Sequence, residues 1–194
     1  HRWTMQEFNA QGNEFRKMTG IIKIFIDILL SRAGPQDLPA SKQLLGICFA
    51  TLVVLQGVLG TWLIPGDEAI VPQAILSTLI TLAWVALVLQ LSGRPERFVQ
   101  TAIALLGIAC LFAPVSIPLV STIRPEVGQP VAMTPLALVA FVLSIFLIYV
   151  NARILRAATE RSMFQCVLLF MAGKLFTFFV LVALGLGADA PAAG

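Results

Sequence analysis

Lys174 is the residue whose type and position point most directly to chemistry. It lies in the middle of a long apolar run, where a charged side chain costs at least about 2.5–3.5 kcal/mol on insertion scales. Such residues usually face the interior of a helix bundle and mark a pathway or a binding site. The first question is therefore which other residues could reach Lys174.

Four further residues are predicted to lie at about the depth of Lys174. A helix rises about 1.5 Å per residue, and counting from the ends of the apolar runs places Gln56 level with Lys174. Thr81 and Ser144 fall within one turn of that level. Pro114 leaves a backbone carbonyl one turn earlier without its helical donor. We therefore predict a polar site near the bilayer middle, formed by Lys174, Gln56, Thr81, Ser144 and Pro114.

The predicted spans contain no carboxylate that could pair with Lys174, because every Asp and Glu lies outside them. Three interpretations of Lys174 stay open. The amine is neutralised or hydrogen-bonded within the bundle, it extends toward the lipid headgroups, or it pairs with an acidic group of a partner subunit or ligand.

Arrangements typical of soluble enzymes are missing from the sequence. The one histidine is His1, and the three cysteines lie in apolar runs without paired or metal-ligand spacing. Gly-rich phosphate loops and zinc-protease motifs are also absent. We predict a protein that is not an enzyme, with no catalytic residue, cofactor or metal site.

The composition predicts a membrane protein that carries this polar site on helices. Hydrophobic residues make up 58% and charged residues 12% of the 194 residues, whereas a soluble domain has roughly 45–50% and about 25%. Apolar runs of at least about 18 residues can each cross the hydrocarbon core. We predict an all-α, polytopic bundle of five transmembrane helices within a domain at residues 41–187. The spans are expected at residues 43–64, 69–91, 98–120, 131–150 and 162–186.

Residues 18–33 are expected to form an amphipathic helix before the first span. Polar or small residues recur there every three or four positions, and the segment is too short to span. We predict that it lies in the headgroup plane, with Lys23, Asp27 and Phe25 as a membrane-surface anchor. Residues 1–17 are expected to be disordered or non-native, and residues 188–194 to be a disordered tail.

Segments outside the predicted spans are alternately rich and poor in Lys and Arg, so that these residues gather on one side of the membrane. This asymmetry predicts the orientation of the chain. The pattern places the amino terminus in the cytoplasm and the carboxyl terminus in the periplasm of a bacterial inner membrane. Because the basic residues flank spans rather than form one face, nucleic acid is not an expected partner. Those on the predicted cytoplasmic side are Arg2, Arg16, Lys17, Lys23, Arg32, Lys42, Arg94, Arg97, Arg153, Arg156 and Arg161.

The order of a polar amino-terminal segment, five closely spaced spans over residues 41–187 and a short tail resembles the Yip family. The sequence GPQDLP at residues 34–39 is similar in composition and location to the DLYGP-type motif of eukaryotic members. The resemblance implies a five-span membrane protein. Eukaryotic members work with Rab GTPases in membrane traffic, and the resemblance transfers no functional residue to this chain.

Three functions remain open at this stage. The first is an accessory, scaffolding or assembly subunit of a bacterial inner-membrane complex, with membrane lipids and other integral membrane subunits as partners. The second is a small transporter or channel that uses Lys174 and Gln56 at the bilayer midplane. The third is a protein that organises lipids through residues 18–33.

Overall fold

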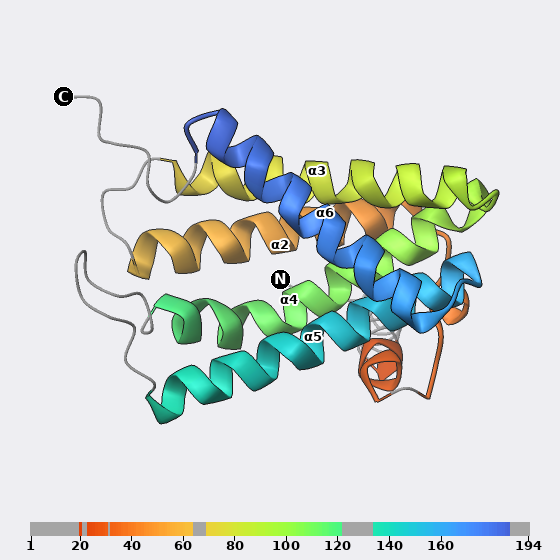
Figure 1. Cartoon of the computed structure of the whole chain (residues 1–194), viewed down its shortest axis with the longest axis horizontal. Helices are drawn as coiled ribbons and strands as arrows, with labels where there is room; N and C mark the ends of the chain where they lie inside the picture. The colour runs from red at the N-terminus through yellow and green to blue at the C-terminus, as the bar shows by residue number, and fades with distance from the viewer. Residues whose placement is uncertain (1–19, 21–22, 31, 64–68, 122–133, 187–194) are drawn as a thin grey trace, which may run out of the picture.

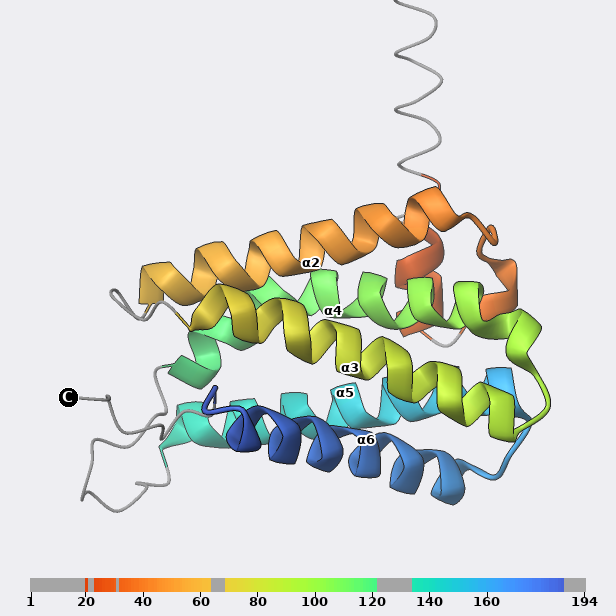
Figure 2. The same ribbon diagram turned by 90° about the horizontal axis from the view of Figure 1, so that it is seen from above.

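The computed structural model describes residues 20, 23–30, 32–63, 69–121 and 134–186. Within these residues the fold is all-α, and Figures 1 and 2 show long helices running side by side. The described elements are the 3-10 turns η1 (Pro35–Asp37) and η2 (Pro95–Arg97) and the helices α2 (Lys42–Leu63), α3 (Ile70–Leu91), α4 (Phe98–Ser121), α5 (Pro135–Thr159) and α6 (Met163–Ala183).

These five long helices confirm the predicted five-span, all-α architecture. Each one is long and apolar enough to cross a membrane. The chain is therefore a multi-pass integral membrane protein whose outer surface contacts lipid. The helix bounds differ most from the predicted spans at α5, which continues to Thr159, whereas the span was expected to end at residue 150. Arginine is a good helix former, and Arg153 and Arg156 extend the helix beyond its apolar part.

Helix α4 forms the centre of the bundle. It contacts α2, α3 and α5, and residues 101–108 in its first half are all buried. The most apolar stretch of α4 is 44% buried, compared with 17% for that of α2. The first half of α4 is therefore packed against protein, while much of α2 faces lipid.

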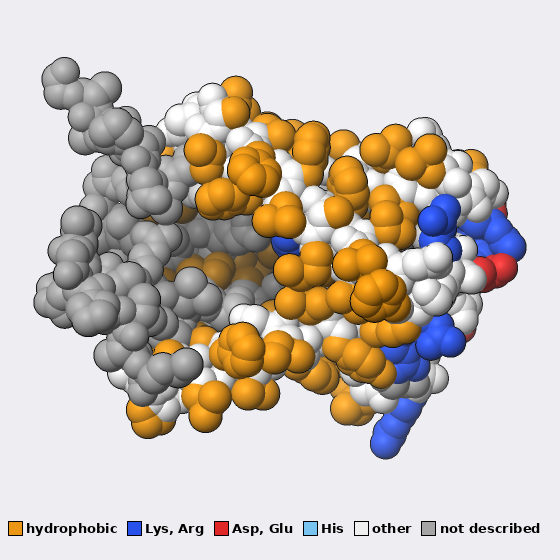
Figure 3. Space-filling model, in the orientation of Figure 1, with side chains coloured by type: hydrophobic (Ala, Val, Ile, Leu, Met, Phe, Trp, Pro, Cys, Tyr) orange, Lys and Arg blue, Asp and Glu red, His pale blue; other side chains and the backbone are white. Residues whose placement is uncertain are grey.

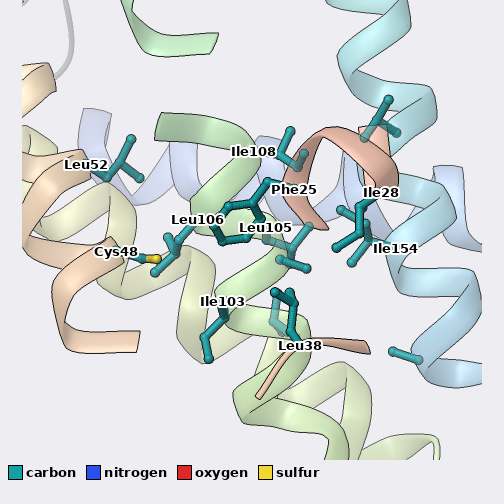
Figure 4. Close-up of a cluster of buried hydrophobic side chains, with 14 of the residues drawn as sticks. Phe25, Ile28, Leu38, Cys48, Leu52, Ile103, Leu105, Leu106, Ile108 and Ile154 are labelled. Carbon is teal, nitrogen blue, oxygen red and sulfur yellow. The ribbon is translucent and has the colours of Figure 1, made fainter. Parts of the chain in front are cut away.

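The helix over residues 23–29 crosses the direction of the long helices, seen end-on in Figure 1 and from the side in Figure 2. Its direction agrees with a helix in the membrane plane. The role expected for Phe25 as a lipid anchor is wrong, however, because Phe25 is only 7% exposed and is buried against α4. A Cβ atom on Gly107 would overlap the Phe25 ring. Figure 4 shows Phe25 and Ile28 among side chains of α4 and α5.

The other two anchor residues of that helix are less buried than Phe25. Lys23 is exposed and Asp27 is half-buried. The backbone carbonyl of Asp27 accepts hydrogen bonds from the amides of Arg32 and Ala33, at 2.7 and 3.1 Å. The segment therefore turns after Asp27 and leads to η1, where Leu38 is 2% exposed within the same core.

Charged side chains of the described residues gather at one end of the bundle, shown in blue and red in Figure 3. We call this the basic end, and it is formed by the start of α2, the α3–α4 connection, the end of α5 and the α5–α6 connection. Its Lys and Arg residues are Lys42, Arg94, Arg97, Arg153, Arg156 and Arg161.

Candidate functional site

A cavity of about 490 Å³ lies between the long helices, and all five of them line it. It brings together four of the five residues predicted for the polar site: Gln56 of α2, Thr81 of α3, Ser144 of α5 and Lys174 of α6. Pro114 is not among the lining residues, although its neighbours Ala113 and Ser116 are. Ser116 is the polar residue that α4 contributes to the cavity lining.

Sequence reasoning missed several polar side chains of the cavity. Those of α3 follow a helical repeat, since Ser77 and Thr81 are four residues apart and Thr78 adjoins Ser77. That repeat is the signal from which the α3 residues could have been predicted. The missed residues are Ser77, Thr78, Trp84, Ser116, Asn151 and Thr177.

The hydroxyl groups that line the cavity donate hydrogen bonds to backbone carbonyls of their own helices. Thr81 Oγ1 donates to the carbonyl of Ser77, and Ser144 Oγ to that of Ala140, both at 2.8 Å. Ser116 and Thr177 do the same toward the residue four positions earlier. A hydroxyl oxygen that donates in this way keeps lone pairs to accept further hydrogen bonds. The wall therefore offers hydrogen-bond acceptors to a ligand.

Lys174 adds a basic side chain to these hydrogen-bond acceptors. Its position on α6 is eleven residues from Met163, about 16 Å along the helix axis and so near the middle of the bilayer. The Nζ atom lies 5.5 Å from the centroid of the Phe170 ring, within the range of a cation–π contact. Within the described part of the chain, no hydrogen bond or ion pair to Lys174 is found. The ammonium group lacks a counter-ion there.

Contacts between α3 and α6 orient Lys174. The indole nitrogen of Trp84 donates to the carbonyl of Leu169 at 3.0 Å, and the Trp84 ring stacks on Phe176 with centroids 5.7 Å apart. Gly173 gives the Trp84 ring its space, because a Cβ atom there would lie 2.5 Å from Trp84 Cδ1. These contacts fix the rotation of α6 about its axis, so the next residue, Lys174, lines the cavity.

The cavity is closed toward the basic end by apolar packing. Leu155, which lines the cavity, is 1% exposed and packs with Ala152 and Cys166, both fully buried. Thr159 and Cys166 also meet there, with their side-chain oxygen and sulfur 3.6 Å apart. The described contact between α5 and α6 therefore places apolar side chains between the cavity and the basic end.

The cavity opens on one lateral side of the bundle. Figure 3 shows it as a hollow between the surface of α5 and that of α3 and α6. Figure 1 shows α5 and α6 close together at the basic end and apart toward the opposite end. Because the view in both figures is across the long helices, this hollow faces the lipid.

Ion pairs at the basic end join the helices that surround the cavity. Arg94 and Arg97 contact Glu160 at 2.7 and 3.0 Å. Arg97 also donates to the carbonyls of Ala157 and Ala158 at the end of α5. Glu160 has a φ of 57°, the left-handed conformation common after a helix end. The α3–α4 connection is thus bound to the end of α5.

Among the described residues, no group of three or more His, Cys, Asp or Glu side chains could hold a metal ion. Cys48, Cys110 and Cys166 are free, and Cys110 Sγ lies 3.5 Å from the carbonyl oxygen of Cys48. No protein-family model, curated protein or solved structure matches the chain. The fold and the cavity define the chain as a multi-pass membrane protein with a polar site between its spans.

Proposed function

We propose that this protein is a small membrane transport protein whose cavity binds a ligand with a negatively charged group at Lys174. The observation that carries the proposal is the convergence of polar residues from all five long helices on one cavity with a lone cation. Polar and ionisable groups at this depth are expensive and usually functional. A purely structural bundle has no need of them.

The ligand supplies the charge that the described residues do not. A cation in a low-dielectric site gains more from an opposite charge than it would in water. The Lys174 ammonium and the side-chain amide of Gln56 bind the negative group, while the hydroxyl groups that line the cavity accept hydrogen bonds from the rest of the ligand. The packed contact between α5 and α6 separates this site from the basic end, so passage requires that contact to open.

Several predictions from the sequence are retained as part of the proposal. The positions of Lys and Arg at one end support a cytoplasmic basic end, as is typical of bacterial inner-membrane proteins. The absence of a catalytic arrangement in the sequence supports a role outside catalysis, without nucleic acid as a partner. The Yip-type resemblance stays a prediction.

Transport into liposomes tests the proposed function. The purified protein is expected to speed the movement of radiolabelled glycerol 3-phosphate, of fluorescently labelled phosphatidylglycerol, or of both. The Lys174→Gln variant should lower that rate at least about tenfold, since losing one partner of a buried charge pair costs about 2–5 kcal/mol. Lys42→Gln, at the exposed start of α2, is the matched control and should transport normally. The proposal is overturned if neither probe moves faster than in protein-free liposomes, or if Lys174→Gln has no effect.

A second candidate is an accessory subunit whose partner supplies the missing carboxylate from a transmembrane helix. It is favoured by the large apolar side chains that α5 and α6 expose away from the basic end, including Phe141 at 63% and Phe179 at 64%. Such surfaces suit either lipid or another helix. Purification in a mild detergent with mass spectrometry distinguishes the two. A companion protein lost from the Lys174→Gln variant but kept by Lys42→Gln would support the subunit role.

A further inference from the structure

We infer that the ligand of Lys174 is the headgroup of an anionic glycerophospholipid, which reaches the cavity sideways between α5 and α6 while its acyl chains stay in the bilayer. This inference rests on the proposed function and names its substrate class. It is carried by three features: the direction of the opening, the length of the cavity and the chemistry of its polar side chains.

On the side formed by described residues, the opening faces lipid. The hollow in Figure 3 lies on the lateral surface, between helices whose outward sides are apolar. On α5, Val142 and Ile145 flank Ser144, and on α6, Leu175 follows Lys174; all three of these apolar residues are exposed. A molecule that enters from this side passes through hydrocarbon. A lipid can do so, because its acyl chains stay in the bilayer while its headgroup enters the cavity.

The cavity is long enough for a headgroup to travel through more than half of the apolar layer, and Ser116 is the polar residue that α4 supplies along it. On α4 the lining residues run from Leu105 to Ile117, twelve residues or about 18 Å along the axis. That is more than half of a hydrocarbon core of ~30 Å. Lys174 lies near the middle of the bilayer, where a phosphodiester is most costly to place.

The chemistry of the wall matches an anionic headgroup that carries hydroxyls. One ammonium group, from Lys174, complements one phosphodiester charge. The oxygens of Ser116, Ser144 and Thr177 act as acceptors because their protons are already donated to backbone carbonyls. The glycerol hydroxyls of phosphatidylglycerol can donate to them. The choline group of phosphatidylcholine has no donor and adds a second positive charge beside Lys174.

The basic end can bind anionic lipids by itself, so the experiment must measure lipid movement and not lipid binding. Arg153, Arg156 and Arg161 line a separate open pocket of about 660 Å³ at that end. Such residues attract anionic lipids whatever the cavity does. The readout is therefore the transfer of a labelled lipid between leaflets, followed by the reaction of its fluorescent group with external dithionite.

Labelled phosphatidylglycerol is expected to change leaflet faster in liposomes with the wild-type protein than in empty ones, and faster than labelled phosphatidylcholine. Lys174→Gln should abolish this preference. Ser144→Trp, which fills the cavity, should slow both lipids. Val142→Trp, on the lipid-facing side of the same helix, should slow neither. Thermal unfolding of each variant in detergent verifies that it folds.

The results separate this inference from the proposed function. If glycerol 3-phosphate crosses in a Lys174-dependent manner while labelled phosphatidylglycerol moves no faster than in empty liposomes, the lipid substrate is wrong and the proposed function stands. If neither probe moves, both fail. Lipid transfer that Ser144→Trp leaves unchanged would also contradict the inference, because the headgroup would then pass outside the cavity.

Discussion

Trp84 of α3 packs directly over Gly173 of α6, and this contact determines which way the neighbouring Lys174 faces. The rotation of α6 about its axis is set by the fit of an indole ring against a residue without a side chain. Lys174 therefore lines a cavity shared by all five long helices instead of facing the lipid. The bundle geometry and the candidate site depend on the same contact.

Gly173→Ala is expected to destabilise the bundle. The new Cβ atom would lie 2.5 Å from Trp84 Cδ1, so α3 and α6 must separate. Overpacking of this kind typically costs about 1–3 kcal/mol, and thermal unfolding in detergent measures it. Gly46→Ala in α2 is the control, because nothing lies within 4 Å of its Cβ position and alanine favours the helix. Equal stability of the two variants would contradict the packing described for α3 and α6.

Phe25→Ala is expected to release the helix over residues 23–29 from α4. Removal of a buried phenyl ring usually costs about 3–5 kcal/mol, and here the loss should appear as faster amide hydrogen exchange in that segment. Ile26→Ala is the matched control, since Ile26 is 43% exposed on the same helix. If the two variants exchange equally fast, the segment does not depend on Phe25 for its docking.

Gly107→Ala should release the same helix from the other side of the contact. Its Cβ atom would overlap the Phe25 ring. The double variant Phe25→Ala with Gly107→Ala should be no less stable than Phe25→Ala alone, because the overlap is then gone. Strictly additive losses in unfolding free energy would contradict a direct contact between the two residues.

Glu160→Gln should weaken the link between the α3–α4 connection and the end of α5. Because Glu160 and both arginines are partly exposed, each ion pair should contribute about 1 kcal/mol or less. The loss should be largest at low salt and shrink as salt screens the pairs. Glu96→Gln, at an exposed glutamate of η2, is the control. The quantity to compare is the difference in melting temperature between Glu160→Gln and this control. If that difference stays the same as the salt concentration rises, the link is not electrostatic.

The depth of the site could be predicted from the sequence because helical rise converts residue number into distance. Gln56, Thr81, Ser144 and Lys174 were placed at one level by that count, and the structure brings them to one cavity. The rotation of each helix could not be predicted in this way. It depends on contacts such as that of Trp84 with Gly173, which involve residues 89 positions apart along the chain.

The environment of Phe25 could not be predicted for a different reason. An apolar face on a short helix suits a lipid interface and a protein core equally well, since both exclude water. What distinguishes them is Gly107, a gap in the α4 surface that receives the ring. Helix α5 ends beyond the expected span because hydropathy marks only the apolar part of a helix, and Arg153 and Arg156 continue the helix past that part.

Reaction of position 174 with a charged thiol reagent tests the central claim most directly. In a chain with Cys48, Cys110 and Cys166 replaced by alanine, Lys174→Cys and Leu175→Cys are compared in liposomes. Lys174→Cys should react at least about tenfold faster with a water-soluble, negatively charged thiosulfonate, because position 174 lines a polar cavity and Leu175 faces lipid. Equal rates at the two positions, or reaction only at position 175, would contradict the polar cavity on which the proposed function depends.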